Sequence, residues 1–89
     1  MRKPRNNREL QDYLVQLGND LAARGLVDLG GKVCKVAQVP YTVGTEFLGE
    51  SRIVLRRVAA DADTVLSAEE RAAVADVLAE LDRVLDRRA

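Results

Sequence analysis

Apolar residues recur every three or four positions over three long segments of this chain, and this spacing constrains the fold more than any other feature. The clearest stripe lies near the C-terminal end and consists of Val74, Val77, Leu78, Leu81, Val84 and Leu85. Such a stripe covers one side of an α-helix, whereas a half-buried strand alternates at every second residue. The sequence therefore predicts an all-α protein.

The last of these helices has signals at both ends. Ser67 and Glu70 have the spacing of a capping box, in which a hydroxyl accepts a bond from the third amide and a carboxylate reaches back. Acidic residues lead the segment and arginines close it, which is the order that the helix dipole favours. We expect this helix to run from Ala68 to Arg88.

A similar stripe near the N-terminus predicts a helix from Asn7 to Arg24. Its apolar positions are Leu10, Tyr13, Leu14, Leu17 and Leu21. Asn6 with Glu9 resembles a capping box at its start, and Gly25 is suited to a left-handed stop at its end. We expect residues 1–6 to form a flexible basic arm and residues 7–89 to form a single helical domain.

The third striped segment predicts a helix that begins near Thr45 and fades between Ala60 and Asp63. Thr45 is the expected cap, and Glu46 falls in the first turn. The predicted buried positions are Phe47, Leu48, Ser51, Val54, Leu55 and Val58. Ile53 lies off this stripe, so we expect part of the helix to meet a second surface.

The middle of the chain, residues 28–43, leaves helix and extended structure open. A helix from Leu29 to Val39, capped by Asp28 and stopped by Pro40, fits the spacing of the apolar residues. The glycines at 30 and 31 would each cost such a helix about 1 kcal/mol relative to alanine. Residues 39–43 are β-prone and extended around the proline. We predict a short helix followed by an extended connector.

These segments together predict a small bundle of about four helices, two long and two shorter. The chain has 89 residues and only three aromatic side chains, so its core must consist mainly of Leu, Val and Ala. A lone bundle of this size is marginally stable, and association would bury more apolar area. We expect a homodimer more often than a monomer.

Composition also bears on the source and the compartment. No apolar run follows the basic start, and no stretch approaches the ~18 apolar residues of a membrane span. One unpaired cysteine fits a reducing compartment. Arginine outnumbers lysine 11 to 3, a bias associated with GC-rich bacterial coding. We expect a cytoplasmic bacterial protein without membrane contact.

Residues suited to catalysis or metal binding are scarce. The chain has no histidine, so Cys34 and Ser51 have no usual base. We expect Cys34 to be a small core residue, with a reactive thiol beside two lysines as the alternative. Asp61 and Asp63 have the spacing of the first ligands in a calcium-binding loop, but the turn glycine and the bidentate glutamate of such a loop are missing. We predict no catalytic residue, no metal and no cofactor.

Two further patterns have structural explanations. Acidic residues of the last helix fall in i, i+4 pairs, Asp76 with Glu80 and Asp82 with Asp86, and are expected to form a solvated face. Gly30, Gly31 and Lys32 lack the remaining residues of a phosphate-binding loop and indicate a hinge or a helix irregularity.

The third helix and the connector that leads into it are the predicted partner-binding surface. The residues are Tyr41, Thr45, Gly49, Arg52, Ile53 and Arg56. Tyrosine and arginine are favoured at interface centres, and a glycine allows close approach. Alternatively, the two large apolar residues cover a satellite core, and Gly49 marks a crossing of two helices within the molecule. The basic cluster with Arg57 could equally bind the acidic last helix.

The leading functional hypothesis is a small non-enzymatic protein that binds another protein, as an immunity-like protein or a regulatory adaptor does. The first alternative is a helical nucleic-acid-associated regulator that uses the basic arm. Zero net charge and the lack of stacking aromatics argue against it. The second alternative is a small all-α enzyme that binds an anionic substrate. Its candidate residues are Arg8, Arg24, Lys35, Arg52 and Arg56.

Overall fold

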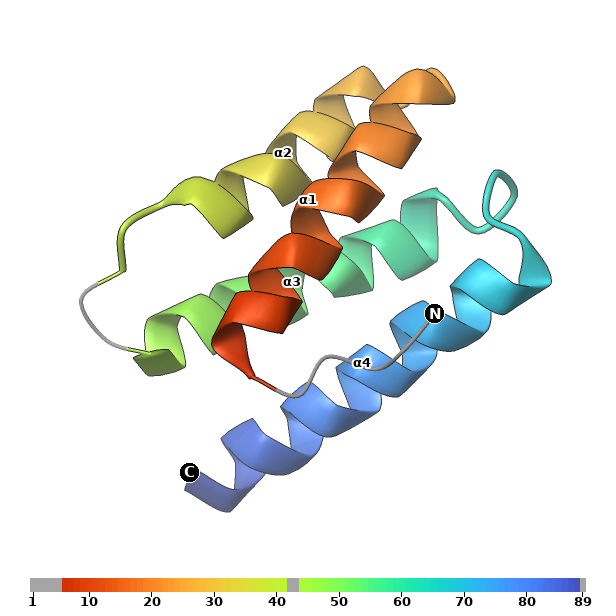
Figure 1. Cartoon of the computed structure of the whole chain (residues 1–89). Coiled ribbons are helices and arrows are strands. Elements are labelled where there is room, and N and C mark those ends of the chain that lie inside the picture. The colour runs from red at the N-terminus through yellow and green to blue at the C-terminus, as the bar shows by residue number, and fades with distance from the viewer. Residues whose placement is uncertain (1–5, 42–43, 89) are drawn as a thin grey trace.

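Four helices make up the computed structural model, which describes residues 6–41 and 44–88 (Figure 1). They are α1 (Asn7–Ala23), α2 (Val27–Gln38), α3 (Gly44–Asp61) and α4 (Ala68–Arg88). These residues contain no strand, and the predicted all-α fold is confirmed. With lengths of 17, 12, 18 and 21 residues, the helices of the described residues are three long and one short rather than two of each. Except for Asn6, the predicted arm lies outside the described residues.

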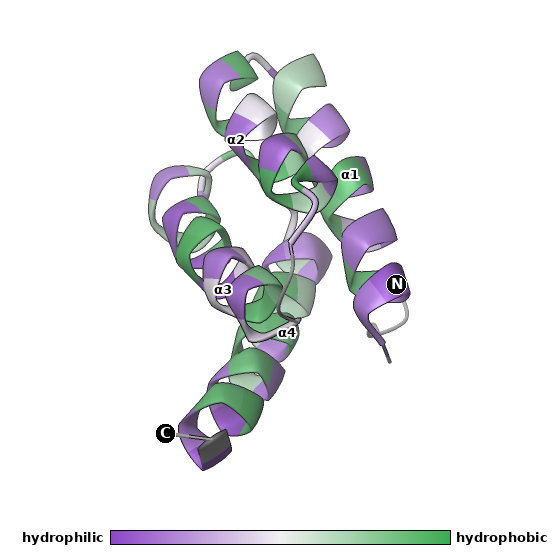
Figure 2. Cartoon of the chain, turned by 90° about the vertical axis from the view of Figure 1, so that its left-hand side faces the viewer, coloured by the Kyte–Doolittle hydropathy of each residue, from purple (hydrophilic) through white to green (hydrophobic). Residues whose placement is uncertain are grey.

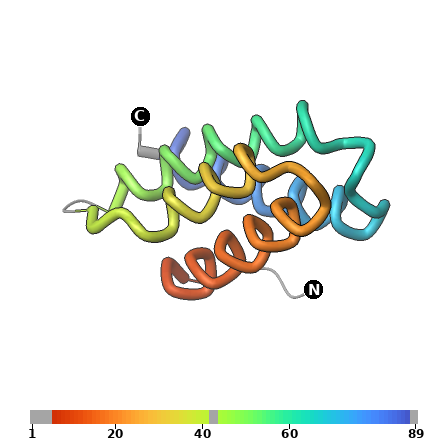
Figure 3. The backbone as a smooth tube through the Cα atoms, turned by 90° about the horizontal axis from the view of Figure 1, so that it is seen from above, coloured from red at the N-terminus to blue at the C-terminus, as the bar shows by residue number. Residues whose placement is uncertain are grey.

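The helices pack in chain order, α1 on α2, α2 on α3, and α3 on α4. Figures 1 and 3 show two antiparallel pairs, with α2 and α3 side by side where the pairs meet. Each helix carries hydrophobic and hydrophilic positions in turn along its length (Figure 2), as amphipathic helices do. The most deeply buried side chains come from all four helices and are Leu14, Leu21, Val33, Ser51, Leu55, Val58 and Val74. The predicted stripes therefore form one core, except for Val84 and Leu85 near the end of α4, which are half-buried and lie outside it.

The helices α1 and α4 are capped at their starts by the residues that the sequence predicts. The Asn6 side chain accepts a hydrogen bond from the Glu9 amide at 2.9 Å. Ser67 Oγ accepts from the Glu70 amide at 3.1 Å, and the Glu70 carboxylate accepts from the Ser67 amide at 2.8 Å. This reciprocal pair is a complete capping box, and α4 has the predicted bounds.

The turn between α1 and α2 explains why α2 begins earlier than predicted. Gly25 has a φ of +96°, and the amide of Leu26 bonds back to the Leu21 carbonyl at 2.9 Å. This Schellman closure ends at Leu26, so Val27 is free to start the next helix. Asp28 therefore lies within the first turn of α2 and is not its cap, which corrects the prediction. Its carboxylate lies near the positive end of the helix dipole.

The start of α3 and the connector before it also differ from expectation. Because α3 begins at Gly44, Thr45 lies inside the helix and cannot be its cap. The preceding position belongs to residues 42–43, which lie outside the described residues together with that part of the predicted connector. Val39 has an extended conformation with a ψ of 132°, as the following Pro40 requires, and α2 ends before it.

Two glycines bring α1 and α2 into backbone contact. A Cβ added at Gly30 would lie 2.5 Å from the Gly18 carbonyl oxygen and 2.9 Å from the Ala22 amide nitrogen. A Cβ at Gly18 would lie 2.7 Å from the Gly30 carbonyl oxygen. A Cβ at Gly31, by contrast, would meet nothing within 4 Å. Gly30 is thus a packing residue within a continuous helix, and the predicted hinge is wrong.

A polar contact ties the end of α1 to the start of α4. Arg24 donates two hydrogen bonds to the Glu70 carboxylate, at 2.7 and 2.8 Å, and a third to the Val65 carbonyl at 3.1 Å. The hydrogen bonds from Arg24, followed by the bond from the Ser67 amide, lower the pKa of Glu70 to about 2. Burial, together with the negative charge of Glu70, raises the pKa of Tyr13 to about 12. The two helix pairs are therefore joined by charge as well as by the core.

Candidate functional site

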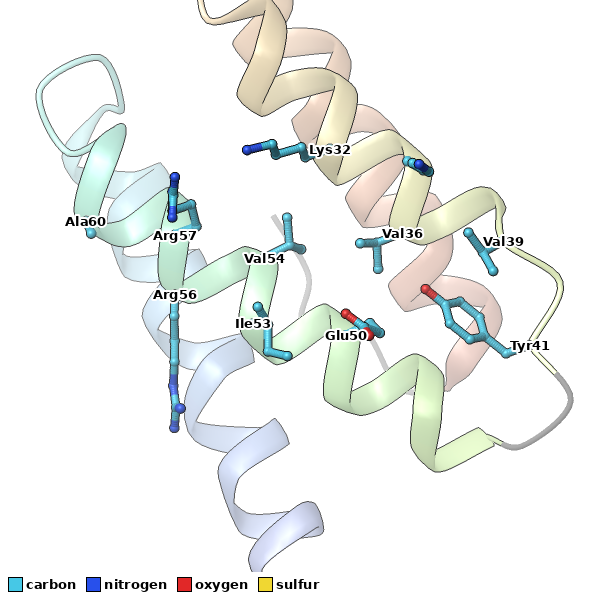
Figure 4. Close-up of a pocket in the computed structure, with 11 residues that line it drawn as sticks. Lys32, Val36, Val39, Tyr41, Glu50, Ile53, Val54, Arg56, Arg57 and Ala60 are labelled. Carbon is cyan, nitrogen blue, oxygen red and sulfur yellow. The ribbon is translucent and has the colours of Figure 1, made fainter.

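An open groove of about 820 Å³ lies between α2 and α3 (Figure 4). We call it the α2–α3 groove. It is lined by Lys32, Lys35, Val36, Val39, Tyr41, Glu50, Ile53, Val54, Arg56, Arg57 and Ala60. More than half of these side chains are apolar, and the charged ones include four bases and one acid. An apolar floor with a basic margin is thus the main chemical character of the groove.

Helical spacing places the residues of each wall. On α2, Lys32, Lys35 and Val36 occupy positions i, i+3 and i+4, and Val39 follows at i+7. The α3 wall repeats this pattern from Glu50 through Ile53, Val54 and Arg57. Residues at these intervals share one side of a helix. The two walls face each other because α2 packs on α3.

Ile53 is the largest apolar side chain left in water in this groove. It is 63% exposed, whereas its neighbour Val54 is 6% exposed and belongs to the core. The prediction that Ile53 lies off the buried stripe is confirmed. It contributes nothing to the core cluster, so the satellite-core alternative is wrong for this residue.

Tyr41 closes the end of the groove nearest the connector. Its ring is half-buried and lies against Phe47, with ring centroids 5.6 Å apart and tilted by 44°. Burial raises its pKa, as do the nearby carboxylates of Glu50 and Glu46. The phenol therefore remains protonated and can donate a hydrogen bond at neutral pH. Because Tyr41 also packs against the core, the satellite-core alternative holds for it in part.

The bases around the groove differ in whether they have acidic partners. Arg57 pairs with Asp61 through Nε at 2.7 Å, and both side chains are exposed. Neither Lys32 nor Lys35 forms an ion pair with any residue of the described ranges, and both are exposed. These two ammonium groups are therefore available to carboxylates from outside the molecule.

Arg52 and Arg56 bind carboxylates of α4, although Arg56 also lines the groove. Arg56 donates to Asp82 Oδ1 at 3.0 Å, and Arg52 lies 3.4 Å from the same oxygen and 3.5 Å from Asp86. The alternative in which the acidic last helix partners this basic cluster is confirmed for Arg52 and Arg56 but not for Arg57, which pairs with Asp61 of its own helix. Asp82 and Asp86 are accordingly more than a solvated acidic row.

The groove thus includes three of the six predicted surface residues. Tyr41, Ile53 and Arg56 line the groove, whereas Thr45, Gly49 and Arg52 do not. A Cβ at Gly49 would meet nothing within 4 Å, so this glycine does not mark a crossing of helices within the molecule. The α2 wall was missed, although Lys32, Val36 and Val39 already share the spacing of one helical face.

Cys34 lies on the opposite side of α2. Its half-buried Sγ lies 3.8 Å from the Val15 carbonyl oxygen and 3.7 Å from Asn19 Oδ1, both on α1. The thiol therefore points into the α1–α2 contact. It is separated from the groove that its neighbours Lys32 and Lys35 line.

The residues considered for an anionic substrate do not converge. Arg24 is bound to Glu70, and Arg52 and Arg56 are bound to Asp82. Only Lys35 and Arg56 of the five reach the groove. Within the described part of the chain, no three His, Cys, Asp or Glu side chains are grouped as a metal site.

No family model matches the chain, and no curated protein or solved structure is significantly similar to it. Among the described residues, none of the helices is both long enough and apolar enough to span a bilayer.

Proposed function

We propose that this chain is a non-enzymatic protein that acts by binding another protein, and that the α2–α3 groove is the binding surface. The observation that carries the proposal is Ile53, a large apolar side chain that is 63% exposed between the charged walls of the groove. Apolar surface gathered in a concave site and rimmed by polar groups is typical of interaction sites. Val36, Val39 and Tyr41 extend this surface along the groove.

The distribution of charge favours a protein partner over nucleic acid. Most arginines of the fold are engaged with carboxylates, as in the pairs of Arg52 and Arg56 with Asp82. A phosphate backbone requires a row of available bases, and binding to it weakens steeply with salt. A regulatory adaptor or an immunity-like protein of the bacterial cytoplasm is the role that we propose. The alternative that we propose is self-association, in which the groove binds a second copy of this chain.

A pair of matched variants tests the proposal. Ile53→Glu places a charge in the groove. The control, Val27→Glu, places the same charge at the start of α2, outside the groove. The two side chains are equally exposed in the wild type, Ile53 at 63% and Val27 at 64%. Both proteins should remain helical by circular dichroism. Proteins recovered from source-cell extract by the tagged wild type should be retained by Val27→Glu and lost by Ile53→Glu. Equal recovery by both variants would refute the groove as the surface.

The same variants separate self-association from binding to a different protein. Light scattering over a range of concentrations gives the mass of each protein in solution. A dimer that is disrupted by Ile53→Glu and preserved by Val27→Glu would identify the partner as a second copy. Repeating the recovery at several salt concentrations would expose a nucleic-acid-dependent interaction by its steep decline.

A further inference from the structure

We infer that the α2–α3 groove receives an amphipathic helix of a different protein, whose apolar face is flanked by acidic side chains. This inference rests on the proposed function and specifies the chemistry of the partner. Three features carry it: the length of the apolar floor, the two lysines that have no acidic partner in the described part of the chain, and the composition of the chain's own acidic helix.

The dimensions of the groove fit about three turns of helix. Its α3 wall extends from Glu50 to Ala60, which is about 15 Å at 1.5 Å per residue. A helix of about ten residues covers this length and presents apolar anchors at positions i, i+3, i+4 and i+7. The groove is open, so it would leave much of a small molecule in water, whereas a helix needs to bury only one face.

The charges at the margin select the polar residues of that helix. Lys32 and Lys35 lie on the α2 wall and have no acidic partner among the described residues. Figure 4 shows Lys32 and Arg57 at one end of the groove, and Glu50 beside Tyr41 toward the other. Carboxylates that flank the apolar face of the partner would therefore meet the two lysines of the α2 wall, whereas Arg57 is already paired with Asp61.

The acidic helix of a second copy does not match this description. Of the large apolar residues of α4, Val74, Val77 and Leu81 are buried in its own core and Leu78 packs against it, whereas Val84 and Leu85 are half-buried and lie outside the core. Its exposed positions include the small residues Ala72, Ala75 and Ala79, which offer no large anchor to a groove. Val84 and Leu85 are adjacent and do not form a row spaced i, i+3, i+4 and i+7, so a complete row of large anchors has to come from a different protein.

Synthetic peptides provide the direct test. The probe is a fluorescein-labelled helical peptide of about 12 residues, with leucines at positions i, i+3, i+4 and i+7 and glutamates flanking them. In a companion peptide, every glutamate is replaced by lysine. Fluorescence anisotropy with the purified full chain should show binding of the acidic peptide, and binding of the basic peptide should be weaker by roughly tenfold or more.

Charge-reversal variants connect this preference to the lysines. Lys32→Glu with Lys35→Glu should abolish or reverse the preference for the acidic peptide. The control is Arg83→Glu with Arg87→Glu, which changes the net charge equally on α4, outside the groove. The control should retain the preference, and raising the salt concentration should weaken the binding of the acidic peptide.

Each result distinguishes this inference from the proposed function. Equal binding of both peptides, or a preference that survives in the lysine variant, would overturn the acidic character of the partner. If neither peptide binds while recovery of a native protein still depends on Ile53, the inference fails and the proposed function stands. If Ile53→Glu changes neither recovery nor peptide binding, both fail. A dimer that depends on Ile53 would replace the proposed partner with a second copy.

Discussion

Substituting Gly30 by alanine should destabilise the protein, although alanine is the better helix former. In the middle of a helix, the exchange by itself gains about 1 kcal/mol. The new Cβ would, however, lie 2.5 Å from the Gly18 carbonyl oxygen and 2.9 Å from the Ala22 amide nitrogen. Both atoms belong to the backbone of α1, so no side chain can rotate to relieve the contact. The two helices have to separate.

Separation by 0.5–1 Å forfeits roughly a quarter to a half of each van der Waals contact across the helix pair. Overpacking of this kind costs about 3 kcal/mol at the upper end of its usual range. After the helix-propensity gain is subtracted, the free energy of unfolding of Gly30→Ala should fall by about 2 kcal/mol. This is a large share of the roughly 4–13 kcal/mol that a chain of this length possesses.

Gly31→Ala is the matched control, because it makes the same chemical change one position along the same helix. Apart from its chain neighbours and the backbone of its own helix, nothing in the described residues lies within 4 Å of its Cβ position, so it should raise the stability by up to about 1 kcal/mol. Urea titrations followed by circular dichroism at constant pH measure both variants. The two midpoints should move in opposite directions from the wild type. If Gly30→Ala is as stable as the wild type, the close crossing of α1 and α2 is refuted.

Two further predictions concern the contact between the helix pairs and the core. Because the pKa of Glu70 is lowered from 4.5 to about 2, its contribution to stability is complete above pH 4.5 and disappears as the pH falls toward 2. Glu70→Gln should therefore lose less stability than the wild type over this pH range, as measured by urea titrations at several pH values. If the free energy of unfolding depends on pH in the same way in both proteins, the contact with Arg24 is contradicted. Leu17 and Leu81 are 5% and 4% exposed, so Leu→Ala at either should cost roughly 2–5 kcal/mol. Val27→Ala, at a 64% exposed site, should shift the unfolding midpoint little, and three equal midpoints would show that the core assignment is wrong.

Helix ends that depend on neighbouring residues were predictable from the sequence. The Ser67 hydroxyl and the Glu70 carboxylate act within one turn, so their spacing alone defines the start of α4. Gly25 similarly defines the end of α1, because its positive φ is unfavourable for other residues. The start of α2 was misassigned to Asp28, since the closure at Leu26 depends on a bond to Leu21 across the turn.

Features that depend on distant residues were only partly predictable. The contact of Gly18 with Gly30 requires knowledge of where two helices cross, and Gly18 carried no signal in the sequence. The exposure of Ile53 followed from its position off the stripe, but the groove around it arises from the packing of α3 on α2. Arg52 and Arg56 formed a visible cluster. Their pairing with Asp82 depends on the way α4 folds back along α3.

The backbone contact between α1 and α2 also limits how the sequence can diverge in evolution. Gly18 and Gly30 each exclude a methyl group for steric reasons, and Gly25 between them is fixed by its dihedral angle. Homologues that keep this helix pair should therefore retain three glycines spaced seven and five residues apart, even where the rest of the sequence has drifted. Gly31 and Gly49 face no such restriction and are free to vary. The glycine spacing is thus a signature by which distant relatives of this chain can be recognised.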